Sequence, residues 1–261
     1  MGEVIVITSG KGGVGKTTTT ASLGAALAQV GRSVALVDAD IGLRNLDLAL
    51  GLENRIVYDL LDVVSGACVL HQALIRDARY PGMQLLPAAQ TRDKAAVSPE
   101  RMAEIAGKLR EEFEFVLVDC PAGIEQGFRN AVAGADRAIL VTVPEVTAVR
   151  DAARVKELLE AQQIPLAGMV LNRFRPKMAR RGAIMGVDDA VEILDMELLG
   201  VVPEDEAVVR LGNLGEPLVR EKSPAAQAYR QIVAKLSGGG EETTKVTGGF
   251  LRTLLGMGAA R

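Results

Sequence analysis

A glycine-rich segment near the start of the chain carries the residue types that bind phosphate groups. Residues 10–17, GKGGVGKT, match the spacing G-x-x-x-x-G-K-[ST] between a β-branched run and a stretch with helical spacing. Glycines let successive backbone N–H groups turn inward, and the N-terminus of the following helix adds positive potential. Lys16 would neutralise the β- and γ-phosphates of a nucleotide, and the Thr17 hydroxyl would bind Mg²⁺. The predicted nucleotide-binding residues in this loop are Gly10, Lys11, Gly12, Gly13, Val14, Gly15, Lys16, Thr17 and Thr18.

Three aspartates follow other apolar runs and suit the metal-binding part of such a site. Asp119 ends the run Phe115–Asp119 and fits the aspartate that anchors Mg²⁺ in nucleotide hydrolases. Asp38 and Asp40 supply further carboxylates at the end of another run, although a turn cap is the alternative role for Asp40. Together with Thr17, these side chains predict a magnesium site beside the phosphate loop.

The rest of the sequence supplies the elements that would bring these residues together. Short runs that are apolar on both faces indicate strands buried between two helical layers, so their alternation with helical stretches predicts an α/β, doubly wound, mostly parallel sheet. The expected strands are Val4–Thr8, Val34–Asp38, Gln84–Pro87, Phe115–Asp119, Ala138–Val143, Gly168–Asn172 and Leu198–Val202. The expected helices are Lys16–Val30, Pro99–Glu112, Thr147–Gln162, Asp188–Leu194 and Pro224–Leu236.

Polar residues follow most of the expected strands, and a parallel sheet would place them along one edge. Ligands of open α/β sheets bind at the carboxyl ends of the strands. Residues spread over most of the chain are therefore expected to meet in one crevice. They are Ser9, Asp38, Asp119, Glu145, Asn172 and Glu204.

Composition excludes several classes of protein. The 261 residues carry a net charge of −3 and only 3% aromatic side chains, which argues against a dedicated nucleic-acid-binding protein. Two cysteines, Cys68 and Cys120, make no disulfide framework and suit a reducing compartment. We find no signal-peptide pattern at the start and no apolar run long enough to span a bilayer, so we expect a cytoplasmic protein.

The last part of the chain differs in composition from the rest. We expect a globular domain over residues 1–236 and a flexible, glycine-rich linker over 237–249. In the final segment, 250–261, helical spacing places Phe250, Leu251, Leu254 and Leu255 on one face. This pattern predicts an amphipathic, membrane-targeting helix, and a helix packed back on the domain is the alternative.

Several segments resemble the MinD/ParA family of ATPases. The loop has an additional lysine, Lys11, ahead of the usual Lys16, and so resembles the deviant Walker A motif of this family. Residues 38–47 resemble the family's switch I segment. Within the family, the segments similar to the septum-site-determining branch are 90–94, 119–125, 144–151, 203–205 and 215–217. The resemblance therefore extends over nearly all of residues 1–236 and implies the fold of P-loop nucleoside triphosphatases.

The resemblance also implies a role for each site residue. Lys11 would reach across a nucleotide-sandwich dimer to the phosphates of the partner copy, so that hydrolysis requires the dimer. Asp40 would orient the attacking water, and Lys11, Lys16 and Asp40 would form the catalytic set. Thr17 and Asp119 would bind Mg²⁺, with Asp38 acting through a water molecule. The residues that would hold the adenine are Asn172, Arg173, Pro203, Glu204 and Asp205.

The septum-site-determining branch implies partners and a cellular task. Its members form ATP-dependent homodimers that bind anionic lipids of the inner membrane through the C-terminal helix. They recruit the division inhibitor MinC to the membrane and are released by MinE, which positions the division septum. By this resemblance we expect the chain to be cytoplasmic, and to be peripheral on the cytoplasmic face of the inner membrane when ATP is bound.

Other classes share parts of this pattern. A ParA-type DNA-partitioning ATPase shares the loop but relies on a basic face to bind DNA. A net charge of −3 argues against such a face. A flagellar-number ATPase also has a membrane-seeking tail, and residues 42–45 and 90–94 favour the septum branch over it. A nitrogenase-type iron protein needs two cysteines in each subunit to hold a cluster that bridges the dimer. A metabolic kinase needs a second substrate site. A scaffold that binds ATP without hydrolysing it would have no use for Lys11 and Asp40.

Overall fold

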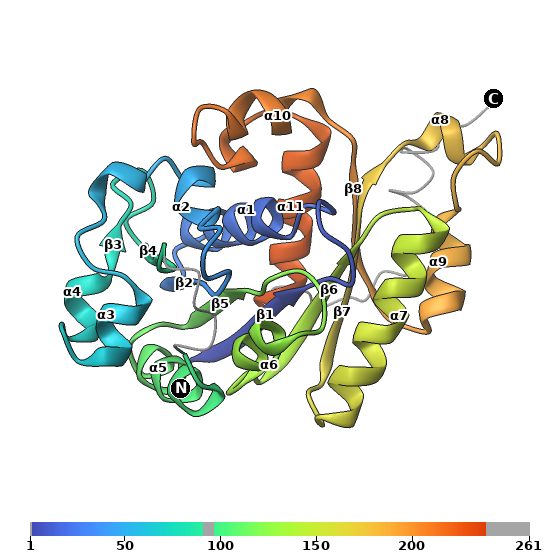
Figure 1. Cartoon of the computed structure of the whole chain (residues 1–261). Helices are drawn as coiled ribbons and strands as arrows, with labels where there is room; N and C mark the ends of the chain where they lie inside the picture. Colours follow the sequence, from blue (N-terminus) through green and yellow to red (C-terminus); the bar gives the residue numbers. More distant parts are fainter. Residues whose placement is uncertain (1, 91–96, 239–261) are drawn as a thin grey trace.

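The computed structural model describes residues 2–90 and 97–238, and one eight-stranded sheet lies at its centre (Figure 1). The strand order is β3-β4-β2-β5-β1-β6-β7-β8, and every neighbouring pair is parallel except β3 with β4. The strands are β1 (Glu3–Thr8), β2 (Val34–Asp38), β3 (Ile75–Arg76), β4 (Met83–Leu86), β5 (Phe115–Asp119), β6 (Arg137–Thr142), β7 (Leu166–Phe174) and β8 (Leu198–Pro203). The predicted doubly wound, mostly parallel sheet is confirmed.

Helices cover both faces of the sheet (Figure 1). The first layer contains α1 (Lys16–Gln29), α2 (Leu46–Ala49), α10 (Glu206–Gly212) and α11 (Pro224–Leu236). The second contains α3 (Leu60–Ser65), α4 (Leu70–Ala73), α5 (Pro99–Glu112), α6 (Gln126–Val132), α7 (Val146–Ala161) and α9 (Val187–Leu194). A short helix, α8 (Pro176–Ala179), and 3₁₀ turns at Glu53–Arg55 and Leu218–Arg220 complete the described elements.

The two layers explain why the strands are apolar on both faces. Successive side chains of a strand point to opposite faces. In β1, Ile5 and Ile7 pack into the core under α1 and α11, whereas Val4 and Val6 pack into the core under α5 and α7. Each of these side chains is at most 1% exposed. The apolar runs in the sequence are therefore continuous because helices cover both faces of the sheet.

Serine–proline pairs start two of the predicted helices. The Ser98 side chain accepts a hydrogen bond from the backbone N–H of Arg101, and Pro99 takes the first helical position of α5. Ser223 and Pro224 start α11 in the same way. A hydroxyl cap satisfies a backbone N–H that has no partner within the helix, and proline has no N–H to satisfy. Both helices have the bounds that the sequence predicted.

The segment between β2 and β4 differs most from the sequence prediction. It holds α2, α3, α4 and β3, none of which the sequence analysis predicted. Strand β3 has two residues and pairs antiparallel with β4 at the edge of the sheet. The helices α2 and α4 have four residues each. Elements of two or four residues complete only about one helical turn or one strand period, and α3, with six residues, completes fewer than two turns. Their hydrophobic pattern therefore carries no usable signal.

Some of the sequence predictions concern residues outside the described part of the chain. These are the linker beyond Gly238, the membrane residues Phe250, Leu251, Leu254 and Leu255, and residues 91–94 of the segment 90–94. Among the described helices, none has both the length and the apolar character needed to cross a membrane.

Candidate nucleotide-binding site

The glycine-rich loop leaves β1 and leads into α1 through backbone conformations that need glycine. Gly13 and Gly15 have φ angles of 77° and 94°, which lie in the left-handed region. A Cβ atom at Gly15 would lie 2.3 Å from Nδ2 of Asn172, and one at Gly10 would lie 2.3 Å from the carbonyl of Asp151. The loop is therefore held tightly between β7 and α7, with the N-terminus of α1 directly after it.

Lys16, Thr17 and Asp119 form the buried part of the site. Lys16 is only 8% exposed and Asp119 only 1%. The Thr17 hydroxyl donates a hydrogen bond of 2.6 Å to Oδ2 of Asp119, and the Thr20 hydroxyl lies 3.2 Å from Oδ1. Both oxygens of this carboxylate are thus oriented by hydroxyls from the first turns of α1. This arrangement places the predicted metal-binding side chains of the loop and of β5 against each other.

Asp38 lies beside Asp119 and holds the start and the end of the switch I segment. The two aspartates are register neighbours across β2 and β5. Oδ1 of Asp38 accepts the backbone N–H of Asp40 at 2.9 Å, and Oδ2 accepts the N–H of Leu46 at 3.1 Å. Asp38 is fully buried. Its carboxylate therefore fixes the backbone that carries Asp40.

Burial of two neighbouring carboxylates shifts their protonation. Burial, with the negative charge of Asp119 in second place, raises the pKa of Asp38 to about 8. Burial also raises the pKa of Asp119 to about 6, against the opposing effects of the Thr17 hydrogen bond and of Lys16. A cation at this edge would favour the ionised form of both groups. Such electrostatics fit a metal site.

The donor set suits Mg²⁺ that is shared with a nucleotide. The described residues contain no group of three or more His, Cys, Asp or Glu side chains that could hold a metal by themselves. Mg²⁺ is usually bound by one or two carboxylates together with phosphate oxygens and water molecules. Thr17 and Asp119, with Asp38 behind them, provide the oxygen ligands that this kind of site requires.

Lys11 lies on the outer part of the same loop in a different environment. Its Nζ atom is 2.9 Å from Oε2 of Glu145 and 3.5 Å from the hydroxyl of Thr147, both at the start of α7. The side chains of Lys11 and Glu145 are 42% and 56% exposed. Exposed ion pairs contribute less than about 1 kcal/mol to stability. Lys11 can therefore leave Glu145 for another binding partner at little cost in free energy.

The residues predicted to hold adenine lie at the ends of β7 and β8. Nδ2 of Asn172 donates to the carbonyl of Val14 at 2.8 Å, and its Oδ1 accepts the N–H of Arg173 at 2.9 Å. A carboxamide has two N–H groups and two oxygen lone pairs. Asn172 can therefore support the loop and still bond to a base edge.

Two charged residues beside Asn172 are paired with each other. A guanidinium nitrogen of Arg173 lies 3.6 Å from Oε1 of Glu204. Glu204 also forms two hydrogen bonds with Arg175, which keep the pKa of its carboxyl below the ordinary value. Asp205 has a local role as well, because its side chain accepts the N–H groups of Ala207 and Ala225. Of the residues predicted here, Arg173 and Glu204 are exposed, whereas Asn172 and Pro203 are buried.

Sequence reasoning missed three contributors to this site. Thr20 follows Thr17 by about one helical turn in a run of threonines, so its side chain lies on the same face of α1. This spacing could have revealed its contact with Asp119. The pairing of Lys11 with Glu145 and the pairing of Glu204 with Arg175 had no comparable signal, because each joins separate elements through exposed side chains.

Comparisons with known proteins agree with this geometry. The model of the CobQ/CobB/MinD/ParA nucleotide binding domain matches residues 5–218. The septum site-determining protein MinD of Bacillus subtilis is 54% identical over 241 residues, which cover 91% of this chain and 90% of that protein.

Solved structures give the same result. MinD in the MinC:MinD cell division protein complex of Aquifex aeolicus has a TM-score of 0.86 and 46% identity, covering 93% of this chain and 98% of that chain. MinD of Pyrococcus horikoshii, complexed with Mg-ADP, has a TM-score of 0.82 and 32% identity, covering 95% of this chain and 98% of that chain. The chain belongs to the CobQ/CobB/MinD/ParA family of nucleotide-binding proteins and, within it, to the septum site-determining MinD ATPases.

Proposed function

We propose that the chain hydrolyses ATP only as a dimer in which each copy completes the site of the other. The observation that carries this proposal is the difference between the two lysines of the loop. Lys16 is buried beside Asp119, whereas Lys11 is held at the rim by an exposed ion pair. A single chain already supplies one cation for the phosphates. The second cation lies at the exposed rim of the loop, which supports a role toward a partner copy.

The residues divide the chemistry between them. The loop N–H groups and Lys16 would bind the phosphates of ATP. Mg²⁺, when bound, would neutralise charge on the phosphate oxygens, and Thr17 and Asp119 would hold it. Asp40 would orient the attacking water. Lys11 of the other copy would stabilise the negative charge that develops during hydrolysis, as an arginine finger does.

We further propose that dimerisation controls membrane binding through the C-terminal segment. Fully burying one large apolar side chain contributes roughly 1.5–3 kcal/mol, but ordering a backbone costs roughly 1–2 kcal/mol for each residue. One amphipathic tail would therefore bind only marginally. Two tails on a dimer make the second insertion intramolecular, which raises the avidity by ~10²–10⁴. The proteins would hence bind anionic inner-membrane lipids with ATP and leave after hydrolysis.

The proposed cellular task follows from the family. The Aquifex aeolicus structure is a complex of MinD with MinC, which supports MinC as a partner of this chain. In the proposed cycle the ATP-bound dimer recruits MinC to the cytoplasmic face of the inner membrane, and MinE releases it by stimulating hydrolysis. This cycle would position the division septum.

Flotation with vesicles that contain anionic lipids tests the membrane step. The full chain should float with the vesicles in a non-hydrolysable ATP analogue and stay in solution in ADP. A chain that ends at residue 249 is the matched control, because it keeps the described site and lacks the predicted helix. Equal flotation of the full chain in both nucleotides would contradict the proposal.

A further inference from the structure

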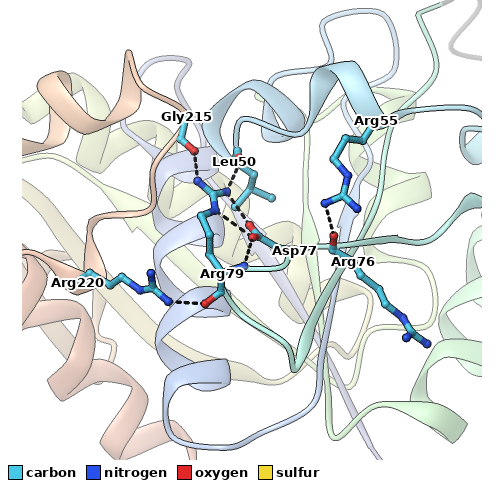
Figure 2. A network of polar contacts seen from close by, with 7 residues as sticks. All are labelled: Leu50, Arg55, Arg76, Asp77, Arg79, Gly215 and Arg220. Carbon is cyan, nitrogen blue, oxygen red and sulfur yellow. Dashed lines mark hydrogen bonds and ion pairs between the residues drawn. The ribbon is translucent and has the colours of Figure 1, made fainter.

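Arg79 forms a junction between three segments of the chain (Figure 2). Its guanidinium donates to the carbonyl of Leu50, which directly follows α2. A second nitrogen donates to the carbonyl of Gly215 at 2.9 Å, in the loop between α10 and the 3₁₀ turn at Leu218–Arg220. Asp77, in the turn between β3 and β4, accepts from the same guanidinium at 2.9 and 2.6 Å.

One of these segments leads directly to the catalytic carboxylates. Helix α2 begins at Leu46, whose backbone N–H donates to Asp38, and ends just before Leu50, whose carbonyl accepts from Arg79. The switch I segment and α2 are therefore fastened at both ends. Asp38 provides one attachment from inside the site, and Arg79 provides the other from outside it.

The backbones that Arg79 joins are packed against each other without side chains. A Cβ atom at Gly215 would lie only 2.4 Å from Cα of Gly51, and one at Gly51 would lie 3.0 Å from the Gly215 carbonyl oxygen. Around this contact, Leu50 and Leu218 are buried in the core under α1 and α11. Arg79 adds the hydrogen bonds that join the two backbones at this point, to the carbonyls of Leu50 and Gly215.

Arg79 is itself held in one orientation. Asp77 is 2% exposed, and it also accepts the backbone N–H of Arg79 at 2.9 Å. The hydrogen bonds to Asp77 raise the pKa of the Arg79 guanidinium. Arg220 donates to the Arg79 carbonyl (Figure 2). The Arg220 guanidinium also lies over the ring of Tyr80, 4.8 Å from its centroid. The guanidinium is thus oriented before any ligand binds.

We infer that Arg79 is a positioning residue that fixes the switch I segment for hydrolysis by fastening the end of α2 to Asp77 and Gly215. The inference rests on the proposed function, because it assigns Asp40 of this segment to the attacking water. Arg79 has no contact with the phosphate loop among the bonds described above. Its loss should therefore affect the placement of Asp40 more than the binding of the phosphates.

Arginine is needed for geometric reasons. The planar guanidinium presents five N–H donors in a fixed arrangement, whereas an ammonium is a compact charge with three donors on a flexible stem. A lysine at position 79 can keep a charge beside Asp77, but it cannot satisfy the carboxylate and both carbonyls in the same geometry. Arg79→Lys therefore removes the junction but leaves a positive charge beside the buried Asp77 carboxylate.

Hydrogen exchange of the full-length, nucleotide-free chain tests the junction directly. Two amides report on α2: that of Leu46, which donates to Asp38, and that of Leu52, which donates to the carbonyl of Asp47 at 2.9 Å. In Arg79→Lys, both should exchange about tenfold faster or more, while the amides of α1 keep their wild-type rates. Arg55→Lys is the matched control, because Arg55 also donates to a backbone carbonyl, that of Arg76 at 2.8 Å, and this bond does not involve α2 (Figure 2). Unchanged exchange at Leu46 and Leu52, or an equal increase throughout the chain, would overturn the inference.

Steady-state kinetics separate positioning from folding. We expect Arg79→Lys to lower kcat by about tenfold or more, because small displacements of a catalytic group are costly. The KM for ATP should stay within about twofold, because the loop contacts remain. A loss in KM with unchanged kcat would overturn the inference. Wild-type protein that lacks ATPase activity would refute the proposed function instead, and the exchange experiment would still decide the role of Arg79.

Discussion

The inner and outer parts of the phosphate loop differ in burial although they are five residues apart. Lys16 and Thr17 lie against Asp119, whose two oxygens are both hydrogen-bonded. Lys11 is exposed and pairs with Glu145, itself more exposed still. The inner part is built by contacts within one chain. The outer part is held by a contact that costs little to break.

This difference fits the proposal that one loop serves two sites, its own and that of a partner copy. Buried, hydrogen-bonded groups are fixed before the nucleotide arrives, which suits groups that bind phosphate and metal. An exposed lysine with a weak partner is available to another molecule. The comparison therefore predicts that substitutions in the inner part abolish binding, whereas those in the outer part abolish pairing and leave binding intact.

The largest effect is expected for Lys16→Ala. This change removes the buried cation that would meet the phosphates and that offsets the charge of Asp119. Hydrogen bonds to charged groups contribute roughly 1.5–3 kcal/mol each, so the loss of two should weaken ATP binding about 100-fold or more. Isothermal titration calorimetry measures this directly. Lys11→Ala in the same loop is the control and should bind ATP within about threefold of wild type.

The second prediction concerns pairing. Lys11→Ala should remain monomeric with magnesium and ATP, because the partner's phosphates lose their cation. Asp40→Ala should accumulate as a dimer, because ATP binds but is not hydrolysed. Size-exclusion chromatography with light scattering distinguishes the two. If Lys11→Ala dimerised at the same ATP concentration as the wild-type protein, the distinction between the inner and outer parts of the loop would be wrong.

A smaller effect is expected for the second hydroxyl on Asp119. Thr20→Val keeps the shape of the side chain and removes a buried hydrogen bond. One such bond contributes roughly 1 kcal/mol, so the free energy of unfolding in urea should fall by about that amount. The affinity for magnesium-ATP should fall by about fivefold. Thr17→Val is the comparison and should lose more affinity, because the Thr17 hydroxyl is also a proposed ligand of Mg²⁺. Equal effects of the two changes on affinity would show that Thr17 has no metal role.

The smallest effect is expected at the base side of the site. Arg175→Gln breaks the exposed pair with Glu204. Exposed pairs contribute less than about 1 kcal/mol, so ATP affinity should change by less than about threefold. Fluorescence titration with a labelled ATP analogue measures it. If the affinity fell by as much as in Lys16→Ala, the rim would be as important for binding as the buried part.

The side chains proposed to bind phosphate and metal could be predicted from the sequence because their chemistry demands a fixed pattern. The spacing of Gly10, Gly15, Lys16 and Thr17 follows from how a loop wraps phosphate. Asp38 and Asp119 were found because each ends a buried strand, and a parallel sheet brings such ends together. The long strands and helices were predicted for the same reason, since each repeats its hydrophobic period several times.

What sequence reasoning missed depends on contacts without a local pattern. The pairing of Lys11 with Glu145 joins residues 134 positions apart through exposed side chains. Arg79 binds backbone carbonyls, and any residue type offers these, so nothing in the sequence marks its partners. Both contacts lie in or beside short, irregular segments. Tertiary packing alone determines such positions.

The most direct test of the central claim is hydrolysis by a mixture of two inactive variants. Lys11→Ala keeps its own Asp40, and Asp40→Ala supplies an intact Lys11, so a mixed dimer contains one complete site. If Lys11 acts on the partner's nucleotide, the variants mixed before ATP is added should hydrolyse it, although neither does so alone. A mixture that is no more active than the two separate proteins would contradict the account.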